Sequence, residues 1–487
     1  LVPGSTTAAD QGTATTNLND FGQGAFNPVT VTIPVNDTTA TFTITPPNDD
    51  KTELAESFSV QAVVAGTTLT KTTTLLDGAS GGGKTYSLTT SQDNITGTSG
   101  NDTILGLNGT GATLTLGDVI NGGAGTDTLK ITSDNATVNM ATATISNVEN
   151  LEINQDAVAA GSQSVALNSV AYTQVTVQGV TGADSAGDTL DVTGAVASSK
   201  IILKDLADVA TTITYTGVSG TADTATVEIA GSTEDATTAG ENDLTIANIE
   251  TLNLSFTTAA NDLDVVTAAA AKTVNITVGA DADTTLRGAA ALGAATAVNI
   301  DATGDLTLAA TAALANDAVI TVTGAGDVDL NTLDDNGADN GVTVAASALT
   351  GGLTVTGGAN TVSITSGSGD DTVTTGAVTT AVSLGAGNDT FNTNSLDFGG
   401  ATAVNVDGGE GTDTINHDDG AEWDADFVAH VKNFEILDIG GGSGVYDANL
   451  IALEAVEVNA DLSGAATITD LTDEAVRITA TTTAALT

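Results

Sequence analysis

Apolar and polar residues alternate in short runs along most of this chain. Near the N-terminus the runs Val29–Ile33, Ala40–Ile44 and Phe58–Val64 place every second side chain on one side. A period of two is typical of a β-strand with one buried face. The segment 6–77 is therefore predicted to form a small antiparallel β-sandwich, with turns at Pro34 and in the cluster 46–50.

The chain then changes in character. Residues 78–85 are rich in Gly and Ser and predict a linker, while residues 1–5 resemble the remnant of a tag, so we expect an excised piece of a longer protein. From 86 to 350, alternating runs such as Ala297–Asp301 and Val319–Val322 recur without regular glycine spacing. These runs fit either coils of a degenerate β-helix or strands of separate sandwiches, and we favour the helix.

Glycine becomes periodic further along the chain. It recurs every nine residues at positions 358, 367, 376 and 385, and again at 399 and 408. A nine-residue step of turn and short strand is the unit of a parallel β-roll, and two steps make one 18-residue coil. The segment 351–420 is predicted to be such a roll, and 421–487 to add terminal coils.

A longer element is repeated three times. Ile145–Ile153, Ile246–Leu254 and Val431–Ile439 share the pattern apolar-x-Asn-apolar-Glu-x-Leu-x-apolar. Internal repetition is typical of solenoids, in which each repeat buries its apolar face against the next. The fold class predicted for the whole chain is therefore all-β, a small sandwich followed by a right-handed parallel β-helix.

Composition narrows the functional classes. The 487 residues include no Cys and carry 61 acidic against 10 basic side chains, a net charge of −51. So few basic residues exclude a nucleic-acid-binding stripe, and they disfavour an anionic membrane surface. The lack of Cys excludes disulfides and thiolate metal sites, and no apolar run is long enough to span a membrane. The carboxylates either keep the protein soluble or face bound cations.

The most specific motif is the turn Gly-Gly-x-Gly-x-Asp followed by Thr and an apolar residue. It occurs in full at 122–127 and 408–413, and in variant form at 97–102, 367–371 and 385–389. The candidate calcium ligands and turn glycines are Gly97, Gly100, Asn101, Asp102, Gly122, Gly123, Gly125, Asp127, Gly367, Gly369, Asp370, Asp371, Gly385, Gly387, Asn388, Asp389, Gly408, Gly409, Gly411 and Asp413.

These residue types suit Ca²⁺, which takes six to eight oxygen ligands from carboxylates and carbonyls. Glycine lets the backbone turn tightly enough to direct its carbonyls at one point. Asp371 and Asp389 are 18 residues apart and should lie one coil apart, whereas the 25-residue spacing of Asp102 and Asp127 predicts their pairing less directly. The alternative is that the turns are structural only. We favour several Ca²⁺ ions whose binding drives folding.

Two resemblances extend this interpretation. The segments Gly12–Thr15, Val31–Pro34, Ala40–Ile44 and Asn48–Phe58 resemble a Calx-β domain, an immunoglobulin-like sandwich of bacterial adhesins. That resemblance implies a further Ca²⁺ site at Asp49, Asp50, Glu53 and Glu56, and a solvated acidic loop is the alternative.

The stretch Tyr86–Ile153, through Asn101-Asp102-Thr103, Leu116-Gly117-Asp118 and the 122–127 turn, resembles the RTX surface-layer (S-layer) proteins of proteobacteria. This resemblance implies type I secretion, an extracellular location on the bacterial cell surface, and Ca²⁺-dependent assembly into a lattice. We expect a structural protein and not an enzyme. The alternatives are a stalk or ligand-presenting segment of an RTX adhesin that contacts cells or surface polysaccharide, and an exported RTX enzyme.

Signatures of catalysis are weak. Gly78–Thr85 satisfies a P-loop pattern, and Gly78–Gly82 a nucleophile-elbow pattern, but the residues that follow favour a strand where a helix is required. His417 and His430 could form a ligand pair or serve as ordinary core or surface residues.

Overall fold

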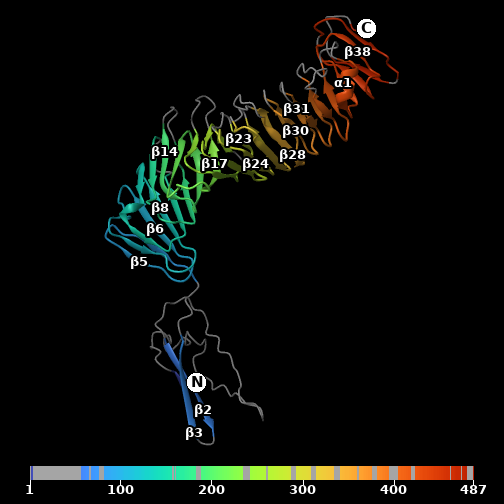
Figure 1. Cartoon of the computed structure of the whole chain (residues 1–487). Coiled ribbons are helices and arrows are strands. Elements are labelled where there is room, and N and C mark those ends of the chain that lie inside the picture. The colour runs from blue at the N-terminus through green and yellow to red at the C-terminus, as the bar shows by residue number, and fades with distance from the viewer. Residues whose placement is uncertain are drawn as a thin grey trace. The chain divides into compact units, whose positions relative to one another are not determined.

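The computed structural model describes most of the chain beyond residue 81. The described residues are 82–155, 158, 161–181, 188–233, 242–258, 261–286, 292–308, 314–333, 341–358, 361–375, 381–393, 404–417, 423–460, 462–472, 474–479 and 486, together with the backbone of 2–3, 56–64 and 67–75. The fold is all-β, and its main element is a parallel β-solenoid of about 13 turns (Figure 1). The predicted fold class is confirmed for this part of the chain.

The N-terminal strands that the structure describes are antiparallel. β2 (Glu56–Val64) pairs with β3 (Thr67–Leu75) from Glu56↔Leu75 to Val64↔Thr67, and β1 (Val2–Pro3) pairs with β2. The antiparallel direction agrees with the alternation in the sequence. The strands predicted within 29–44 lie outside the described residues.

The chain divides into two compact units. Unit 1 comprises Leu1–Leu107, Gly111–Ile131 and Thr142–Leu151, and unit 2 comprises Asn108–Thr110, Thr132–Ala141 and Glu152–Thr487. In unit 1, β7 pairs in parallel with both β5 and β10, and β4 pairs in parallel with β6. The strands that lie wholly or mostly in this unit, beyond the N-terminal three, are β4 (Thr85–Ser87), β5 (Asn94–Thr96), β6 (Thr103–Asn108), β7 (Val119–Asn121), β8 (Thr128–Ser133) and β10 (Thr144–Ser146).

Unit 2 opens with a six-stranded parallel sheet in the order β21-β18-β16-β14-β12-β9. Its strands are β9 (Thr137–Asn139), β12 (Gln163–Ala166), β14 (Thr189–Val196), β16 (Ala210–Thr216), β18 (Leu244–Ile246) and β21 (Val266–Thr267). Each strand of this sheet pairs with the strand at the same position of the adjacent coil. The strands that lie between them in the sequence belong to another face of the same solenoid.

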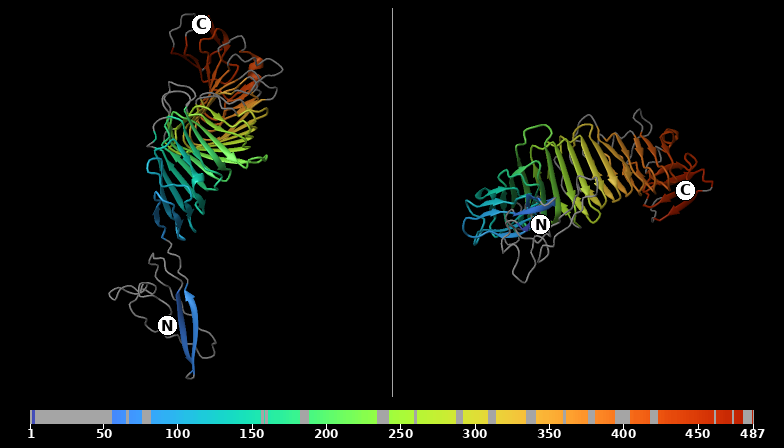
Figure 2. Two further views of the ribbon diagram at one scale, coloured as in Figure 1. Left: turned by 90° about the vertical axis from the view of Figure 1, so that its left-hand side faces the viewer. Right: turned by 90° about the horizontal axis from the view of Figure 1, so that it is seen from below.

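Two further faces of unit 2 run in parallel ladders, visible as stacked arrows in Figure 2. One contains β11 (Asn150–Asn154), β13 (Gln174–Gln178), β15 (Lys200–Ala207), β17 (Thr224–Thr233), β19 (Thr251–Phe256), β22 (Thr273–Val278), β24 (Ala297–Ala302), β26 (Val319–Gly324), β28 (Thr343–Leu349), β30 (Ser363–Thr365), β32 (Ala381–Ser383), β34 (Asn405–Asp407) and β36 (Val431–Lys432). The other contains β20 (Asn261–Leu263), β23 (Thr284–Leu286), β25 (Leu306–Leu308), β27 (Val328–Thr332), β29 (Leu353–Thr356), β31 (Thr372–Thr374), β33 (Thr390–Asn392), β35 (Thr414–Asn416), β37 (Ile436–Asp438), β39 (Ala455–Val458) and β41 (Ala475–Ile478).

The register confirms the coil length predicted from glycine spacing. Thr354 pairs with Thr372, and Thr372 with Thr390, so one coil is 18 residues long in this region. The next step, from Thr390 to Thr414, is longer. The alternating middle of the chain likewise forms parallel coils and not separate sandwiches, as Val298↔Ile320 illustrates.

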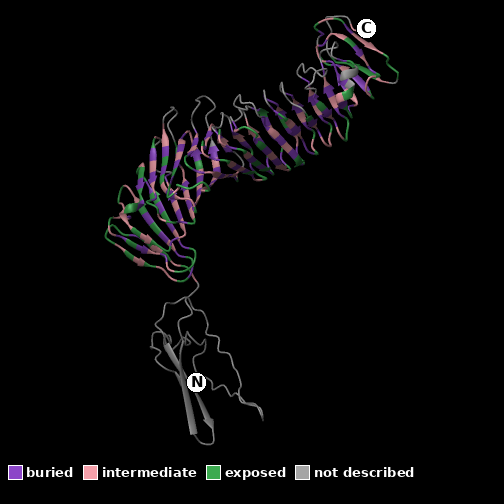
Figure 3. Cartoon of the chain, viewed as in Figure 1, coloured by how far each residue is buried: buried purple, intermediate pink, exposed green. Residues whose placement is uncertain are grey.

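Alternate residues of each strand fill the interior, as the banding in Figure 3 shows. The side chains of Val373, Phe391 and Ile415 are stacked at successive positions of one ladder and are almost fully buried. Helix is confined, among the described residues, to a short 3-10 turn (Met140–Thr142) and to α1 (Ala425–His430). None of the described helices has the length and apolar character needed to cross a membrane. A small parallel pair, β38 (Gly444–Asp447) with β40 (Ala466–Thr469), lies near the C-terminus.

Candidate metal centre

Acidic residues stack at one position of successive coils in unit 2. Asp371, Asp389 and Asp413 each precede a strand of the same ladder, and each is at most 1% exposed. The backbone N–H of Asp371 donates to Oδ1 of Asp389 at 2.8 Å, and that of Asp389 donates to Oδ1 of Asp413 at 2.9 Å. The N–H of Leu353 similarly donates to Asp371 at 2.6 Å. One carboxylate oxygen of each residue therefore continues the hydrogen bonding between coils.

Unit 1 contains the same arrangement. The N–H of Lys84 donates to Oδ1 of Asp102 at 2.5 Å, and the N–H of Asp102 donates to Oδ1 of Asp127 at 2.7 Å. Asp102 and Asp127 are also nearly inaccessible to solvent. The structure thus brings together a pair that the 25-residue spacing predicted less directly, because the coil is simply longer there.

The glycines of the turns are required by close packing between coils. An added Cβ would lie less than 3.0 Å from a backbone oxygen of a neighbouring coil at Gly97, Gly122, Gly123, Gly125, Gly367, Gly369, Gly385, Gly387, Gly408, Gly409 and Gly411. Gly100 contributes the carbonyl that faces Gly125. Each turn therefore presents carbonyl oxygens to the turn stacked on it.

The polar residues beside the aspartates make a second, more exposed column. Oδ1 of Asp370 accepts the N–H of Asn388 at 2.7 Å, and Oδ1 of Asn388 accepts the N–H of Thr412 at 3.1 Å. In unit 1, Oδ1 of Asn101 accepts the N–H of Thr126 at 2.9 Å. These predicted ligand positions therefore hold adjacent turns in register, and the side-chain oxygens of Asn101 and Asn388 are used in doing so.

The second carboxylate oxygen distinguishes the five turns. Among the described residues, Oδ2 of Asp127, Asp389 and Asp413 is buried and has no hydrogen-bond partner. By contrast, Oδ2 of Asp102 accepts the N–H of Thr98 at 2.5 Å, and Oδ2 of Asp371 accepts that of Gly367 at 3.2 Å. A buried anionic oxygen without a donor is costly, so the first three positions call for a cation or a proton.

Burial also raises the pKa of these carboxyl groups. Desolvation is the main cause of the raised pKa at Asp127, Asp371 and Asp413. At Asp389 desolvation, reinforced by the carboxylates of Asp371 and Asp413 and opposed by the hydrogen bond from Asp371, raises the pKa to about 7. The ionised column is therefore unfavourable without a counter-charge.

The arrangement fits a Ca²⁺ site better than a site for a transition metal. No group of three or more His, Cys, Asp and Glu side chains close enough to hold an ion occurs in the part of the chain that the structure describes. A cation here would depend on one or two carboxylates together with the turn carbonyls, and such all-oxygen sets suit Ca²⁺. Asp127, Asp389 and Asp413 are the residues that would hold it most directly.

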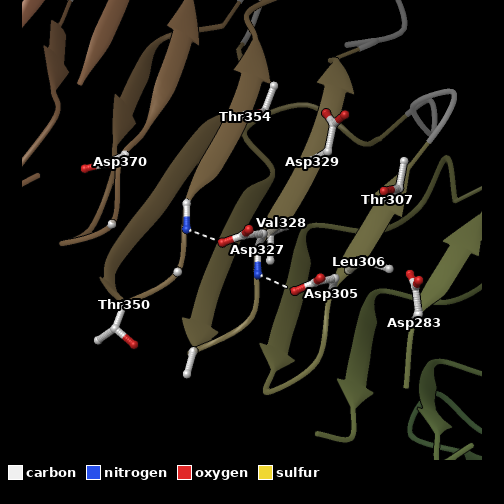
Figure 4. A pocket seen from close by; sticks show the side chains of 14 residues that line it. Asp283, Asp305, Leu306, Thr307, Asp327, Val328, Asp329, Thr350, Thr354 and Asp370 are labelled. Atoms are coloured by element: carbon white, nitrogen blue, oxygen red, sulfur yellow. Dashed lines mark hydrogen bonds between the residues drawn. The ribbon is translucent and has the colours of Figure 1, made fainter. Parts of the chain in front are cut away.

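The exposed column that contains Asp370 also runs through the coils of unit 2 that precede the glycine-rich turns. Asp283, Asp305 and Asp327 occupy equivalent positions of consecutive coils and border an open groove (Figure 4). Oδ1 of Asp305 accepts the N–H of Asp327 at 2.9 Å, and Oδ1 of Asp327 accepts that of Gly352 at 2.8 Å (Figure 4). All three side chains are exposed. These three aspartates were not predicted from the sequence, although their 22-residue spacing is a signal that could have found them.

The repeated element around Asn147, Asn248 and Asn433 was predicted from the sequence without a role. The Glu of each copy accepts the backbone N–H of an Asp in the preceding coil, at 2.8 Å for Glu149 to Asp127 and 2.8 Å for Glu435 to Asp413. In these two copies the repeat is therefore part of the same stacked system as the turns.

Other predicted positions stand apart. Asp49, Asp50 and Glu53 lie outside the described residues, as does the side chain of Glu56. His417 is 1% exposed, and its ring packs against Phe427 and Trp423 at centroid distances of 5.0 and 5.8 Å. Its Nδ1 lies 3.1 Å from Oγ1 of Thr393, so His417 belongs to the core.

The chain was also compared with known proteins. No protein-family model matches it, and no curated protein matches it either.

Proposed function

We propose that this chain is a structural component of a bacterial surface layer, a secreted solenoid that Ca²⁺ orders at its glycine-rich turns. The observation that carries the proposal is the set of buried aspartates, Asp127, Asp389 and Asp413, whose Oδ2 atoms have no donor among the described residues. These atoms lie in turns whose stacked backbones present carbonyl oxygens to one another.

Charge supports the same conclusion. The chain carries 61 acidic and 10 basic residues, and several of the acids stack coil upon coil. Carboxylates at the strand spacing of about 4.8 Å repel one another when ionised. Bound divalent cations remove that repulsion, so the folded state gains stability from the free energy of metal binding. A protein of this kind folds where Ca²⁺ is plentiful, which favours an extracellular location after secretion.

The solenoid supports a structural role. Each coil contacts chiefly its neighbours, so a solenoid presents long, regular faces on which copies of one chain can associate. We propose self-association into a lattice as the working state. A stalk that presents an adhesive domain to cells or polysaccharide uses the same parts, and assembly is the property that separates the two roles.

The test is a titration of Ca²⁺-depleted protein, from micromolar to about 10 mM because extracellular calcium modules bind weakly. Far-ultraviolet circular dichroism reports folding, and light scattering reports assembly. The proposal predicts a cooperative gain of β signal, a higher melting temperature and growth in particle size over one range of Ca²⁺. Gain of structure in a particle that stays monomeric would favour the stalk. If the spectrum and melting curve do not change when Ca²⁺ is added, the proposed role of the turns is refuted. Mg²⁺ is the matched control.

A further inference from the structure

The Asn-x-Glu element recurs with one backbone geometry in all three copies. Its Asn adopts a left-handed conformation, with φ of 48° at Asn147, 59° at Asn248 and 60° at Asn433. Asn tolerates this region better than most residues because its short side chain bonds locally. The turn places the following Glu beside the Asp of the preceding coil.

The contact between Glu and Asp is also the same in each copy. The carboxylates of Glu149, Glu250 and Glu435 accept the N–H groups of Asp127, Asp223 and Asp413 at 2.8, 3.0 and 2.8 Å. In return, the carbonyl of each Asp accepts two N–H groups, from the Glu and from the residue after it. These three hydrogen bonds fix the position of the Asp backbone relative to the Asn-x-Glu element.

Two of the copies follow a complete glycine-rich turn, and there the Asn carbonyl and the Asp side chain both approach the first glycine of the turn. At Gly122 an added Cβ would lie 1.9 Å from the carbonyl oxygen of Asn147 and 2.5 Å from Oδ2 of Asp127. At Gly408 the same distances are 1.8 Å to the carbonyl oxygen of Asn433 and 2.8 Å to Oδ2 of Asp413. A backbone oxygen and a carboxylate oxygen therefore lie close to each other beside this glycine.

The Asn side chains fix these carbonyls. Nδ2 of Asn147 donates to Oδ1 of Asn121 at 2.9 Å, and Nδ2 of Asn433 donates to Oδ1 of Asp407 at 2.7 Å. Asn121 and Asp407 each precede the first glycine of their turn. In both copies the Asn side chain is therefore hydrogen-bonded to the residue that immediately precedes the glycine-rich turn, although the two copies lie in different units.

The third copy differs in both its carboxylate and its turn. Oδ2 of Asp223 accepts the N–H of Gly220 at 3.0 Å, and Val218 stands five residues before Asp223, where the other two copies carry Gly122 and Gly408. The carboxylate is already satisfied, and the turn does not carry the glycine-rich motif. Asn248 and Glu250 therefore serve packing alone, which makes this copy an internal control.

We infer that each Asn-x-Glu element after a complete glycine-rich turn finishes a Ca²⁺ site, with the carbonyl of Asn147 and Oδ2 of Asp127 as ligands of one ion and the carbonyl of Asn433 and Oδ2 of Asp413 as ligands of another. Both aspartates are 0% exposed and their Oδ2 atoms have no partner among the described residues, which points to a bound cation. Glu149 and Glu435 are positioning residues. The inference rests on the proposed binding of Ca²⁺ by the turns, and it adds the ligands from the next coil.

The test counts Ca²⁺ ions bound per full-length chain by equilibrium dialysis, with circular dichroism to verify the fold. Asp127→Asn and Asp413→Asn keep the Oδ1 acceptor and should each remove one ion, and the double variant two. Asp223→Asn, at the equivalent position of the third copy, should leave the number unchanged. Gly408→Ala places a methyl group against both oxygens and should remove the same ion as Asp413→Asn, so the two substitutions combined should still remove one.

Should the alanine or asparagine variants lose their β signal, Asn433→Gly provides a second measurement. Glycine adopts the same φ and keeps the carbonyl, but it lacks the bond to Asp407, so one ion should bind roughly tenfold more weakly. Unchanged affinity in Asn433→Gly, a full complement of ions in folded Asp413→Asn, or the loss of two ions when Gly408→Ala and Asp413→Asn are combined would each overturn the inference. Wild-type protein that binds no Ca²⁺ would instead overturn the proposed function itself.

Discussion

Replacing Asp389 with Asn tests how much the buried carboxylate column costs when no cation is bound. The side chain is 1% exposed, and its Oδ1 accepts the N–H of Asp371 at 2.8 Å. Asn has almost the same shape and keeps that acceptor, but it removes the charge. The variant therefore isolates the electrostatic cost from the packing.

The sign and magnitude follow from the pKa. Burial raises the pKa of Asp389 from 3.8 to about 7, so the folded protein holds the proton more tightly than the unfolded chain. The resulting loss of stability is absent below about pH 4, grows as pH rises, and is complete above about pH 7. A shift of about three pKa units corresponds to a loss of about 4 kcal/mol of unfolding free energy. The buried amide NH₂ of the variant costs about 1–3 kcal/mol at every pH.

The two effects predict that the order of stability of wild type and variant reverses with pH in Ca²⁺-depleted solution. Near pH 4 Asp389→Asn should be less stable than wild type by about 1–3 kcal/mol, and at pH 8 it should be more stable by a similar amount. Saturating Ca²⁺ at pH 8 should restore the advantage of the wild type, because the variant has lost a ligand.

Urea melts followed by circular dichroism measure the free energies, and hydrogen exchange of the segment 371–392 reports the same difference locally, since coils of a solenoid can unfold separately. Asp223→Asn is the control, because Asp223 is already satisfied by the N–H of Gly220. A difference between wild type and Asp389→Asn that stays constant from pH 4 to pH 8 would refute the reasoning.

Three further outcomes test the packing of unit 2. Glu250→Ala removes the acceptor of the Asp223 N–H and should cost about 1–3 kcal/mol in a urea melt without changing the number of Ca²⁺ ions bound; a lost ion would contradict the assignment of this copy to packing. Asn275→Ala interrupts a ladder in which Asn253 and Asn299 bond it at 2.7 and 2.8 Å, so the melting temperature should fall with a cost of about 0.5–1.5 kcal/mol, whereas an unchanged temperature would show that the ladder adds nothing. Phe391→Ala empties a 0% exposed position and should cost about 3–5 kcal/mol, with Phe391→Leu as a milder control; equal stability of the two would contradict close packing there.

The sequence predicted the fold class because its signals are local. Alternation with a period of two needs only a strand with one buried face, and a nine-residue glycine period needs only a repeating turn. Glycine spacing alone therefore predicted the 18-residue coil that joins Thr372 to Thr390. The turn aspartates were found in the same way, since the motif is contiguous in the chain.

What the sequence could not supply is the partner of each group in the next coil. The coil from Asp389 to Asp413 is longer than that from Asp371 to Asp389, so no fixed period identifies which atoms meet. Only the tertiary structure decided that Oδ2 is satisfied at Asp102 but not at Asp127, because a donor from the same turn reaches one and not the other. Residue types and periods fix a solenoid, whereas the hydrogen bonding of a single oxygen depends on how two turns stack.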